Sequence, residues 1–355
     1  MGMLFVPYSA WGHVMPMLAV VAELTNRGVP VRVLAGSPFR SAVEAAGARI
    51  IVPAVAHDVR VPAGFGPAAW TERSLLRYRR RIAWRSTAAA LESELTVEPP
   101  EVCVVDPHIP WAYRSASEFG GRVVPFWTTH APRLFEGGPV LVNTLPELQP
   151  GRKPLGRSVH FVGPLVGAGR PDDSNAQRAD SDSPVLVVAL GTVFARPRGF
   201  FCRIVDAFAG SDWTVMLATG RLPVRELGAI PPNIMAHQWI PQSALLRGAD
   251  VFVTHAGMNS VHEALVRQVP MLLAPRSHEQ RQTADKLVAL GIAERIGRGG
   301  GLLEQAQRLA SDPSMPERFC RIAADVRAAT AAREAADLLV GIAEDVKDQW
   351  RCQVS

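Results

Sequence analysis

The chain of 355 residues carries 38 basic and 33 acidic side chains, with 48% hydrophobic and 20% charged residues. This composition excludes a disordered or low-complexity polymer and fits a globular protein of two domains, each large enough for its own core. The net charge of +5 comes mostly from arginine and is concentrated only between Arg73 and Arg85. We therefore expect no nucleic-acid partner.

The cysteines and the apolar runs exclude further classes of protein. The four cysteines are far apart and show no CxxC spacing, which argues against a structural zinc site and a disulfide framework. The chain opens directly on an apolar strand without a secretory leader, and no apolar run approaches the roughly 18 residues that span a bilayer. We expect a cytoplasmic protein without a membrane partner.

Short apolar runs alternate with helical segments through the first half of the chain. Strands are predicted at 3–6, 31–35, 49–52, 102–105 and 122–127. Helices are predicted at 14–26 and 40–46, and an arginine-rich helix precedes the fourth strand. Continuously apolar strands that are separated by helices indicate a parallel sheet covered on both faces.

The second half repeats this pattern. Its predicted strands lie at 185–190, 213–218, 234–237, 251–254 and 271–274, and its predicted helices at 200–209, 243–247, 259–267 and 282–290. Between the halves, residues 167–183 contain aspartate, proline, glycine and serine without an apolar run, which is typical of a linker.

The fold class predicted is therefore α/β, with two doubly wound, Rossmann-like domains at residues 1–166 and 184–355. In such folds ligands bind at the carboxyl ends of the strands, so we expect a binding cleft between the two sheets. The final helix of the second domain can pack back on the first domain.

A set of aromatic, polar and small residues follows the strands of the second half. They are Trp239, Gln242, His255, Gly257, Asn259, Ser260, Glu263, Glu279 and Gln280. His255 and Gly257 lie where a strand gives way to a helix, and a small-residue turn there exposes backbone N–H groups to an anion such as a diphosphate. Asn259 and Ser260 are also ordinary helix-capping residues.

In its order and spacing, the segment 239–280 resembles the donor-binding signature of nucleotide-sugar glycosyltransferases with the GT-B fold. It is similar in particular to the bacterial antibiotic and macrolide glycosyltransferases, which are relatives of the plant UDP-glycosyltransferases. The similarity extends over residues 3–52, 101–127 and 185–292.

The resemblance implies how the nucleotide would be held. Trp239 would stack on the nucleobase, Gln242 would lie beside the base and the ribose, and Glu263 would accept the ribose hydroxyls. An alternative for Trp239 is simple packing in the core.

The resemblance also implies how the diphosphate and the sugar would be held. His255 and the backbone of residues 257–260 would bind the diphosphate, with Thr192 touching it from the other side. Glu279 and Gln280 would bind the sugar hydroxyls. An alternative for Thr192 is a role in a turn.

In the first half, the resemblance implies that His13 is the general base and that Asp106 orients it. A hydroxyl must lose its proton as it attacks the anomeric carbon, and imidazole is the side chain that titrates near neutral pH. A carboxylate behind the imidazole fixes its tautomer and stabilises the imidazolium. Trp11, His108 and His130 are weaker candidates for the acceptor site.

No metal or cofactor is expected. Asp180-Ser-Asp182 matches the metal-binding triplet of the other large glycosyltransferase class, but it lies in the polar linker away from any strand end, so we interpret it as solvated charge. The helix dipole and His255 can neutralise a leaving diphosphate without a metal.

The chain departs from the family in three places. The first domain is shorter than usual, which favours an open cleft or an acceptor pocket completed by a second copy or another chain. Trp11 stands where relatives often have histidine, and Glu279 replaces the more usual aspartate.

The function predicted is an inverting glycosyltransferase that moves a hexose, with UDP-glucose favoured, to a hydroxyl of a polyketide-like or macrolide-like natural product. Three alternatives stay open: a TDP-deoxysugar-dependent antibiotic glycosyltransferase, a nucleotide-sugar epimerase, and a catalytically degenerate member that binds a partner protein.

Overall fold

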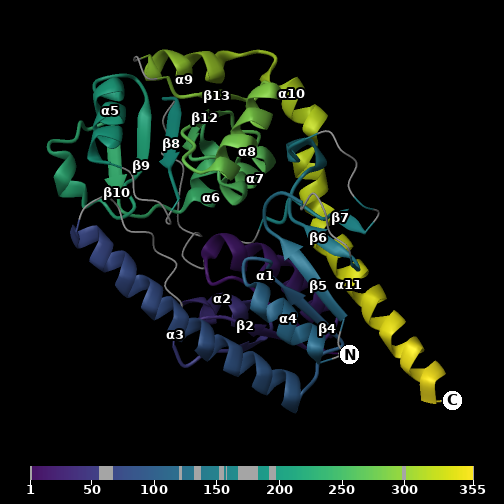
Figure 1. The fold of residues 1–355 in the computed structure, drawn as a ribbon. Coiled ribbons are helices and arrows are strands. Elements are labelled where there is room, and N and C mark those ends of the chain that lie inside the picture. Colours follow the sequence, from purple (N-terminus) through teal and green to yellow (C-terminus); the bar gives the residue numbers. More distant parts are fainter. Residues whose placement is uncertain are drawn as a thin grey trace.

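A computed structural model describes residues 2–55, 67–119, 122–131, 137–151, 156, 158–166, 183–191, 197–297 and 301–354. Nearly all of the predicted linker, together with Thr192, Asp180 and Asp182, lies outside these residues. Two parallel sheets, one in each half of the chain, are stacked one above the other in Figure 1. They confirm the predicted α/β class with two parallel sheets.

The first sheet has seven strands in the order β3-β2-β1-β4-β5-β6-β7. Their bounds are β1 Met3–Val6, β2 Val31–Leu34, β3 Arg49–Ile51, β4 Val102–Val105, β5 Arg122–Trp127, β6 Val140–Val142 and β7 Val159–Phe161. Every residue of β1, β2 and β4 is buried, as expected for central strands with helices on both faces. β1 pairs with β4 from Met3 opposite Val102 to Val6 opposite Val105.

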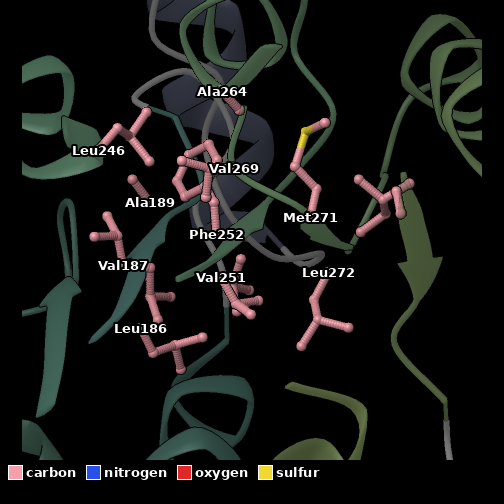
Figure 2. Close-up of a cluster of buried hydrophobic side chains, with 14 of the residues drawn as sticks. Leu186, Val187, Ala189, Leu246, Val251, Phe252, Ala264, Val269, Met271 and Leu272 are labelled. Carbon is pink, nitrogen blue, oxygen red and sulfur yellow. The ribbon is translucent and has the colours of Figure 1, made fainter. Parts of the chain in front are cut away.

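The second sheet has six strands in the order β10-β9-β8-β11-β12-β13. Their bounds are β8 Val185–Ala189, β9 Thr214–Ala218, β10 Ile234–His237, β11 Val251–Thr254, β12 Met271–Leu273 and β13 Ala293–Arg295. Figure 2 shows how side chains from β8, β11 and β12 pack into one apolar cluster, which includes Val187, Phe252 and Leu272. This cluster holds rigid the three strands whose ends carry the predicted donor residues.

The helices cover the faces of these sheets. In the first half they are α1 Trp11–Asn26, α2 Arg40–Ala45, α3 Pro67–Val97 and α4 Pro110–Glu118. In the second half they are α5 Arg198–Phe208, α6 Gln242–Leu245, α7 Met258–Val266, α8 His278–Ala289, α9 Leu302–Ser311, α10 Met315–Ile322 and α11 Ala324–Val354. None of the helices in the described part of the chain is long and apolar enough to cross a membrane.

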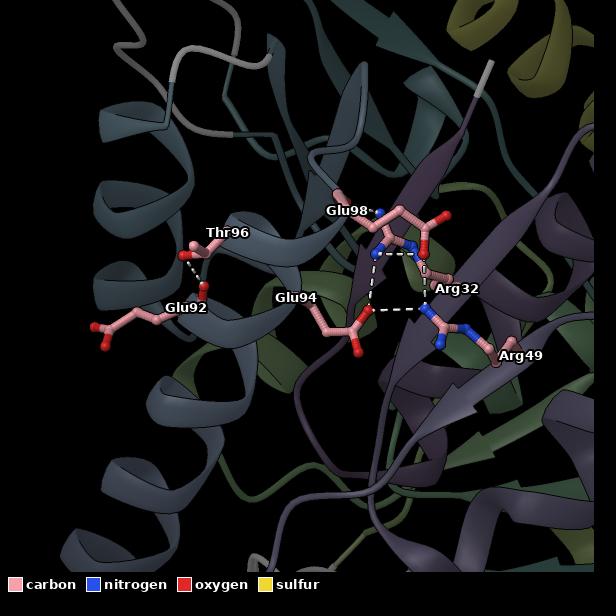
Figure 3. Close-up of polar contacts among 6 residues, drawn as sticks. All are labelled: Arg32, Arg49, Glu92, Glu94, Thr96 and Glu98. Carbon is pink, nitrogen blue, oxygen red and sulfur yellow. Dashed lines mark hydrogen bonds and ion pairs between the residues drawn. The ribbon is translucent and has the colours of Figure 1, made fainter.

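The arginine-rich helix α3 is tied to the edge of the first sheet by ion pairs. Glu94 accepts hydrogen bonds from Arg32 at 2.7 Å and from Arg49 at 2.9 Å, and Glu98 accepts one from Arg49 at 3.0 Å (Figure 3). Because Arg32 is only 5% exposed, it needs these partners to balance a charge that has lost most of its water.

The long helix α11 belongs by sequence to the second half but packs on the first. It runs down one side of the molecule in Figure 1 and contacts α1. Four small buried residues allow a close approach to the core of the first half, and Leu339 fills space in it; the small residues are Ala331, Ala335, Ala336 and Ala343. Conversely, Leu145 and Leu148 come from the first half of the chain but are buried in the core of the second half. The two halves therefore share packing.

Helix α8 begins at His278, four residues before the predicted start at residue 282. Ser277 is its N-cap: the backbone N–H of Gln280 donates to Oγ of Ser277 at 3.1 Å, and the backbone N–H of Ser277 donates to Oε1 of Gln280 at 3.2 Å. This capping box extends the helix toward the strand β12. Glu279 and Gln280 consequently lie in the first helical turn rather than in a loop.

Candidate active site

The strand order of the first sheet brings three loops together. β1, β4 and β5 are neighbours, and because they are parallel their carboxyl ends meet at one edge of the sheet. The loop after β1 carries Tyr8 and leads into α1 with His13, Asp106 ends β4, and Thr128 follows β5. Residues more than 90 positions apart in the sequence thus form one cluster of polar side chains.

Within this cluster, His13 and Asp106 form a short hydrogen bond, with His13 Nδ1 2.7 Å from Asp106 Oδ2. Burial alone would raise the pKa of the Asp106 carboxyl, but hydrogen bonds from His108 and His13 outweigh burial and hold the pKa below its usual value. An ionised carboxylate only accepts hydrogen bonds, so Nδ1 of His13 carries the hydrogen. Nε2 of a neutral His13 then has the lone pair that a base needs.

A second imidazole contacts the same carboxylate. Nδ1 of His108 lies 2.9 Å from Oδ1 of Asp106, and the backbone N–H of His108 donates to the same oxygen at 2.9 Å. The hydrogen bond to Asp106 raises the pKa of His108; burial opposes this, and the charges of Asp106 and Glu279 add to it. The imidazole rings of His13 and His108 meet edge to face, with centroids 4.8 Å apart.

The three side chains form a hydrogen-bonded triad. One ligand atom from each of His13, Asp106 and His108 lies within 4.8 Å of the others, a spacing that a metal ion could also use. However, each imidazole directs Nδ1 at a different carboxylate oxygen over a hydrogen-bond distance. The contacts we observe are therefore those of a proton-sharing group.

Aromatic rings surround the triad. The ring of Tyr8 lies 5.2 Å from that of His13 and 6.0 Å from that of His108, and the indole of Trp127 lies 6.4 Å from His108. Burial raises the pKa of Tyr8, the charge of Arg80 on α3 lowers it, and the charge of Asp106 raises it. Aromatic side chains thus lie next to the polar groups of the triad, a combination that suits an organic acceptor with a hydroxyl group.

In the second sheet, β8, β11 and β12 are neighbours, and the segments after β11 and β12 carry most of the predicted donor residues, whereas Trp239 and Gln242 follow β10. The imidazole of His255 packs between two glycines: a Cβ on Gly191 would lie 2.8 Å from Nε2 of His255, and a Cβ on Gly257 only 2.3 Å from it. Only glycine leaves room for the ring at these positions. Ala256, between His255 and Gly257, adopts a left-handed φ of 61° in this tight turn.

The turn opens directly into α7, whose N-cap is Gly257; in the described part of the chain no side chain caps this end. A helix N-terminus without a capping side chain presents its first backbone N–H groups to an anion. Just beyond, Nε2 of Gln242 donates to Glu263 Oε2 at 2.8 Å and to Ser260 Oγ at 3.2 Å. Three predicted donor residues are therefore linked in one network.

Glu279 connects the two halves electrostatically. Burial raises the pKa of Glu279, whereas the nearby charges of His108 and His13 lower it. Its neighbour Gln280 is only 7% exposed, and Oε1 of Gln280 accepts hydrogen bonds from the backbone of Arg276 at 2.8 Å and of Ser277 at 3.2 Å. The amide oxygen of Gln280 thus takes part in capping the N-terminus of α8.

The starts of α1 and α7 meet between the sheets. A Cβ on Gly12 would lie 3.8 Å from Nδ2 of Asn259, and the two helices are in contact. Since His13 is the next residue after Gly12, the triad lies beside the helix N-terminus that could hold an anion. The candidate base and the candidate diphosphate site thus adjoin.

The remaining predicted residues have diverse surroundings. The indole of Trp239 is 43% exposed, which disfavours the alternative of core packing. Trp11 packs edge to face on Phe39 with centroids 4.8 Å apart. His130 is buried, with Nε2 3.2 Å from Thr283 Oγ1 on α8, and burial together with the charge of Lys286 lowers the pKa of His130 to about 4. Trp11 and His130 therefore contribute to packing and to contact between the halves.

Sequence reasoning missed Tyr8, Thr128 and Trp127. Oγ1 of Thr128 lies 3.1 Å from Nδ1 of His13, and Tyr8 and Trp127 line the triad. Their position directly at or after the ends of β1 and β5 was the available signal, because neighbouring parallel strands end at the same edge.

Comparisons with known proteins agree with this geometry. A family model described as UDP-glucoronosyl and UDP-glucosyl transferase matches residues 153–298. Oleandomycin glycosyltransferase of Streptomyces antibioticus is 29% identical over 385 residues, covering 93% of this chain and 88% of that protein.

Two solved structures are similar over almost the whole chain. The glycotransferase of kitacinnamycin has a TM-score of 0.81 and 26% identity and covers 96% of this chain and 98% of its own. CalG4, the calicheamicin glycosyltransferase, has a TM-score of 0.75 and 27% identity with the same coverage. The two-sheet architecture is thus the GT-B-like one of these glycosyltransferases.

Proposed function

We propose that the chain, which matches the family model described as UDP-glucoronosyl and UDP-glucosyl transferase over residues 153–298, transfers a hexose from a nucleoside-diphosphate sugar to a hydroxyl group of a natural product. The single observation that best supports this is the hydrogen-bonded His13–Asp106 pair beside the start of α7. A base and an anion site in contact are what displacement of a diphosphate by a hydroxyl requires.

In the proposed reaction, Nε2 of His13 takes the proton of the acceptor hydroxyl as its oxygen bonds to the anomeric carbon. The bond from that carbon to the diphosphate oxygen breaks at the same time through an oxocarbenium-like state, and its electron pair leaves with the diphosphate. Asp106 holds the tautomer of His13 and stabilises the imidazolium that forms. Attack from the opposite side inverts the configuration, so an α-linked donor yields a β-glycoside.

The donor would lie on the second half. The exposed indole of Trp239 is available to stack on the base, and the carboxylate of Glu263, linked to Gln242, is suited to accept the ribose hydroxyls. The diphosphate would bind the N–H groups at the start of α7 next to His255, where the helix dipole offsets negative charge without a metal.

The acceptor would lie against the aromatic face formed by Tyr8, His108 and Trp127. The names of the similar proteins, which act in the oleandomycin, kitacinnamycin and calicheamicin systems, support an antibiotic-like natural product as acceptor. We favour UDP-glucose as donor, because Glu279 offers a half-buried carboxylate to two sugar hydroxyls.

The test is the release of nucleoside diphosphate from UDP-glucose and from TDP-deoxysugars, with and without a panel of aglycones, in parallel buffers that contain either EDTA or a divalent cation (Mg²⁺ or Mn²⁺). Acceptor-dependent release together with a new glycoside is expected. Conversion of the sugar without an acceptor would favour an epimerase, and no reaction with any donor would favour a partner-binding protein. A strict requirement for Mg²⁺ or Mn²⁺ would contradict diphosphate binding by α7 and His255 alone.

A further inference from the structure

One buried carboxylate serves two imidazoles in this site. Asp106 is 0% exposed; His13 binds one of its oxygens, and His108 binds the other through both its ring and its backbone. A carboxylate that orients a histidine base needs to contact only that one imidazole, so the second carboxylate oxygen does not require a histidine partner. The additional histidine therefore calls for a role of its own.

The charges in the triad disfavour two imidazolium ions at once. Asp106 supplies one negative charge, and the two rings lie only 4.8 Å apart, so protonating one ring disfavours protonating the other. Each neutral ring already carries one hydrogen, on Nδ1. The two histidines therefore compete for one additional proton, which converts the ring that binds it into an imidazolium. Which ring holds that proton decides whether His13 can act as a base.

The surroundings favour His108 as the charged ring. Its side chain is 41% exposed, against 18% for His13, so water stabilises a cation at His108 better. The hydrogen bond to Asp106 raises the pKa of His108, and the charges of Asp106 and of Glu279, which also interacts with His13, add to it. The other titratable groups facing the pair are Tyr8, which is uncharged near neutral pH, and Arg80, whose charge acts on Tyr8.

We propose that His108 is a positioning residue that carries the positive charge opposite Asp106 and thereby keeps His13 a neutral base. Without a cation at His108, the negative charge of Asp106 would act on His13 alone and favour its imidazolium form, which cannot accept a proton. The proposal rests on the proposed function in assigning the base role to His13.

The first test compares the pH dependence of kcat/KM in the wild type and in His108→Asn. The amide Nδ2 of asparagine can donate to Asp106 from nearly the same position as Nδ1 of histidine but cannot become charged. We expect the acid limb of the profile to move up by about one pH unit relative to the variant's own alkaline plateau, which corresponds to about tenfold in kcat/KM on that limb. The height of the plateau also depends on the contact of His108 with the acceptor, so the position of the limb is the readout. An acid limb that stays in place or moves down would overturn the proposal.

Two further variants make the comparison specific. His108→Ala should move the acid limb in the same direction and also lower the plateau, because the hydrogen bond that holds Asp106 is lost as well. His160→Asn, on β7 three strands away from β4, should reproduce the wild-type profile.

The second test follows the imidazole nitrogens of the substrate-free protein by NMR as the pH is lowered. We expect His108 to take up its proton before His13, and His13 to take up its proton at higher pH in His108→Asn than in the wild type. Wild-type protein in which His13 protonates first would overturn the proposal. This measurement needs no donor or acceptor, so a wild type that transfers no sugar would contradict the proposed function while leaving the titration order to be judged separately.

Discussion

At the scale of single residues, Glu279 links the proposed sugar site to the triad of His13, Asp106 and His108. It lies in the first turn of α8, near enough to His13 and His108 for their charges to lower its pKa against the raising effect of burial. A half-buried carboxylate that loses its sugar hydroxyls is left short of hydrogen-bond partners. Donor selectivity should therefore depend on this side chain.

We expect wild-type protein to transfer glucose faster than a deoxysugar when UDP-glucose and a TDP-deoxysugar compete at equal concentration. Glu279→Ala should lower kcat/KM for UDP-glucose by about 5–150-fold, which corresponds to a loss of about 1–3 kcal/mol, and should affect the deoxysugar less. The matched control is Glu304→Ala, on α9 in the same half. Faster deoxysugar transfer by wild type, with Glu279→Asp shifting the preference toward glucose, would contradict the choice of UDP-glucose.

At the scale of elements, α7 combines the proposed anion site at its start with a buried histidine in its middle. His262 is 1% exposed, and neither ring nitrogen has a hydrogen-bond partner among the described residues. Burial lowers its pKa to about 3. The folded state thus holds His262 neutral over a pH range in which the unfolded chain would protonate it.

The sign of the effect on stability follows from this difference. Between about pH 6.5 and about pH 3 the unfolded state binds the additional proton, so stability is lost as the pH falls through this range. From pH 7 to pH 5 the wild type should lose about 2 kcal/mol more of its free energy of unfolding than His262→Leu. Urea denaturation at both pH values measures this, with His160→Leu as control. Equal losses in wild type and His262→Leu would show that His262 does not contribute.

At the scale of the whole molecule, α11 holds the two halves together by leaving its own half and packing on α1. Leu339 on this helix is 0% exposed within the core of the first half. Leu339→Ala should lower the free energy of unfolding by about 2–5 kcal/mol, whereas Glu334→Ala, an exposed change on the same helix, should alter it by less than about 0.5 kcal/mol. Similar denaturation midpoints for the two variants would contradict the role of α11 in the core.

The overall architecture was predictable from the sequence because central strands such as β1, β4 and β8 are continuously apolar and alternate with helical segments. This pattern can be recognised without knowledge of tertiary contacts. The short strands β7 and β13, of three residues each, were not predicted. They lie at sheet edges and owe their pairing to one neighbouring strand, β6 and β12 respectively. The early start of α8 was visible in Ser277 and Gln280 as a capping box.

The site was predictable in part. His13 and Asp106 follow strands that the topology makes neighbours, and their 2.7 Å contact joins two residues that the resemblance had assigned to one function. The contact between His108 and Asp106 was not predictable. It depends on a backbone turn after Asp106 that brings the imidazole of His108, two residues further along the chain, within hydrogen-bond distance of the carboxylate. Thr192 lies outside the described residues, so its role stays a prediction.

The most direct test of the central claim, that His13 removes the acceptor proton, is the rate of glycoside formation by His13→Ala with two acceptors of different acidity. With an alcohol acceptor we expect turnover to fall roughly 10²–10⁴-fold, while nucleotide affinity stays nearly unchanged. With a nitrophenol that is largely ionised at about pH 8, the loss should be much smaller, because no proton has to be removed. Wild-type turnover of the alcohol, or equal losses for both acceptors, would contradict the role of His13 as base.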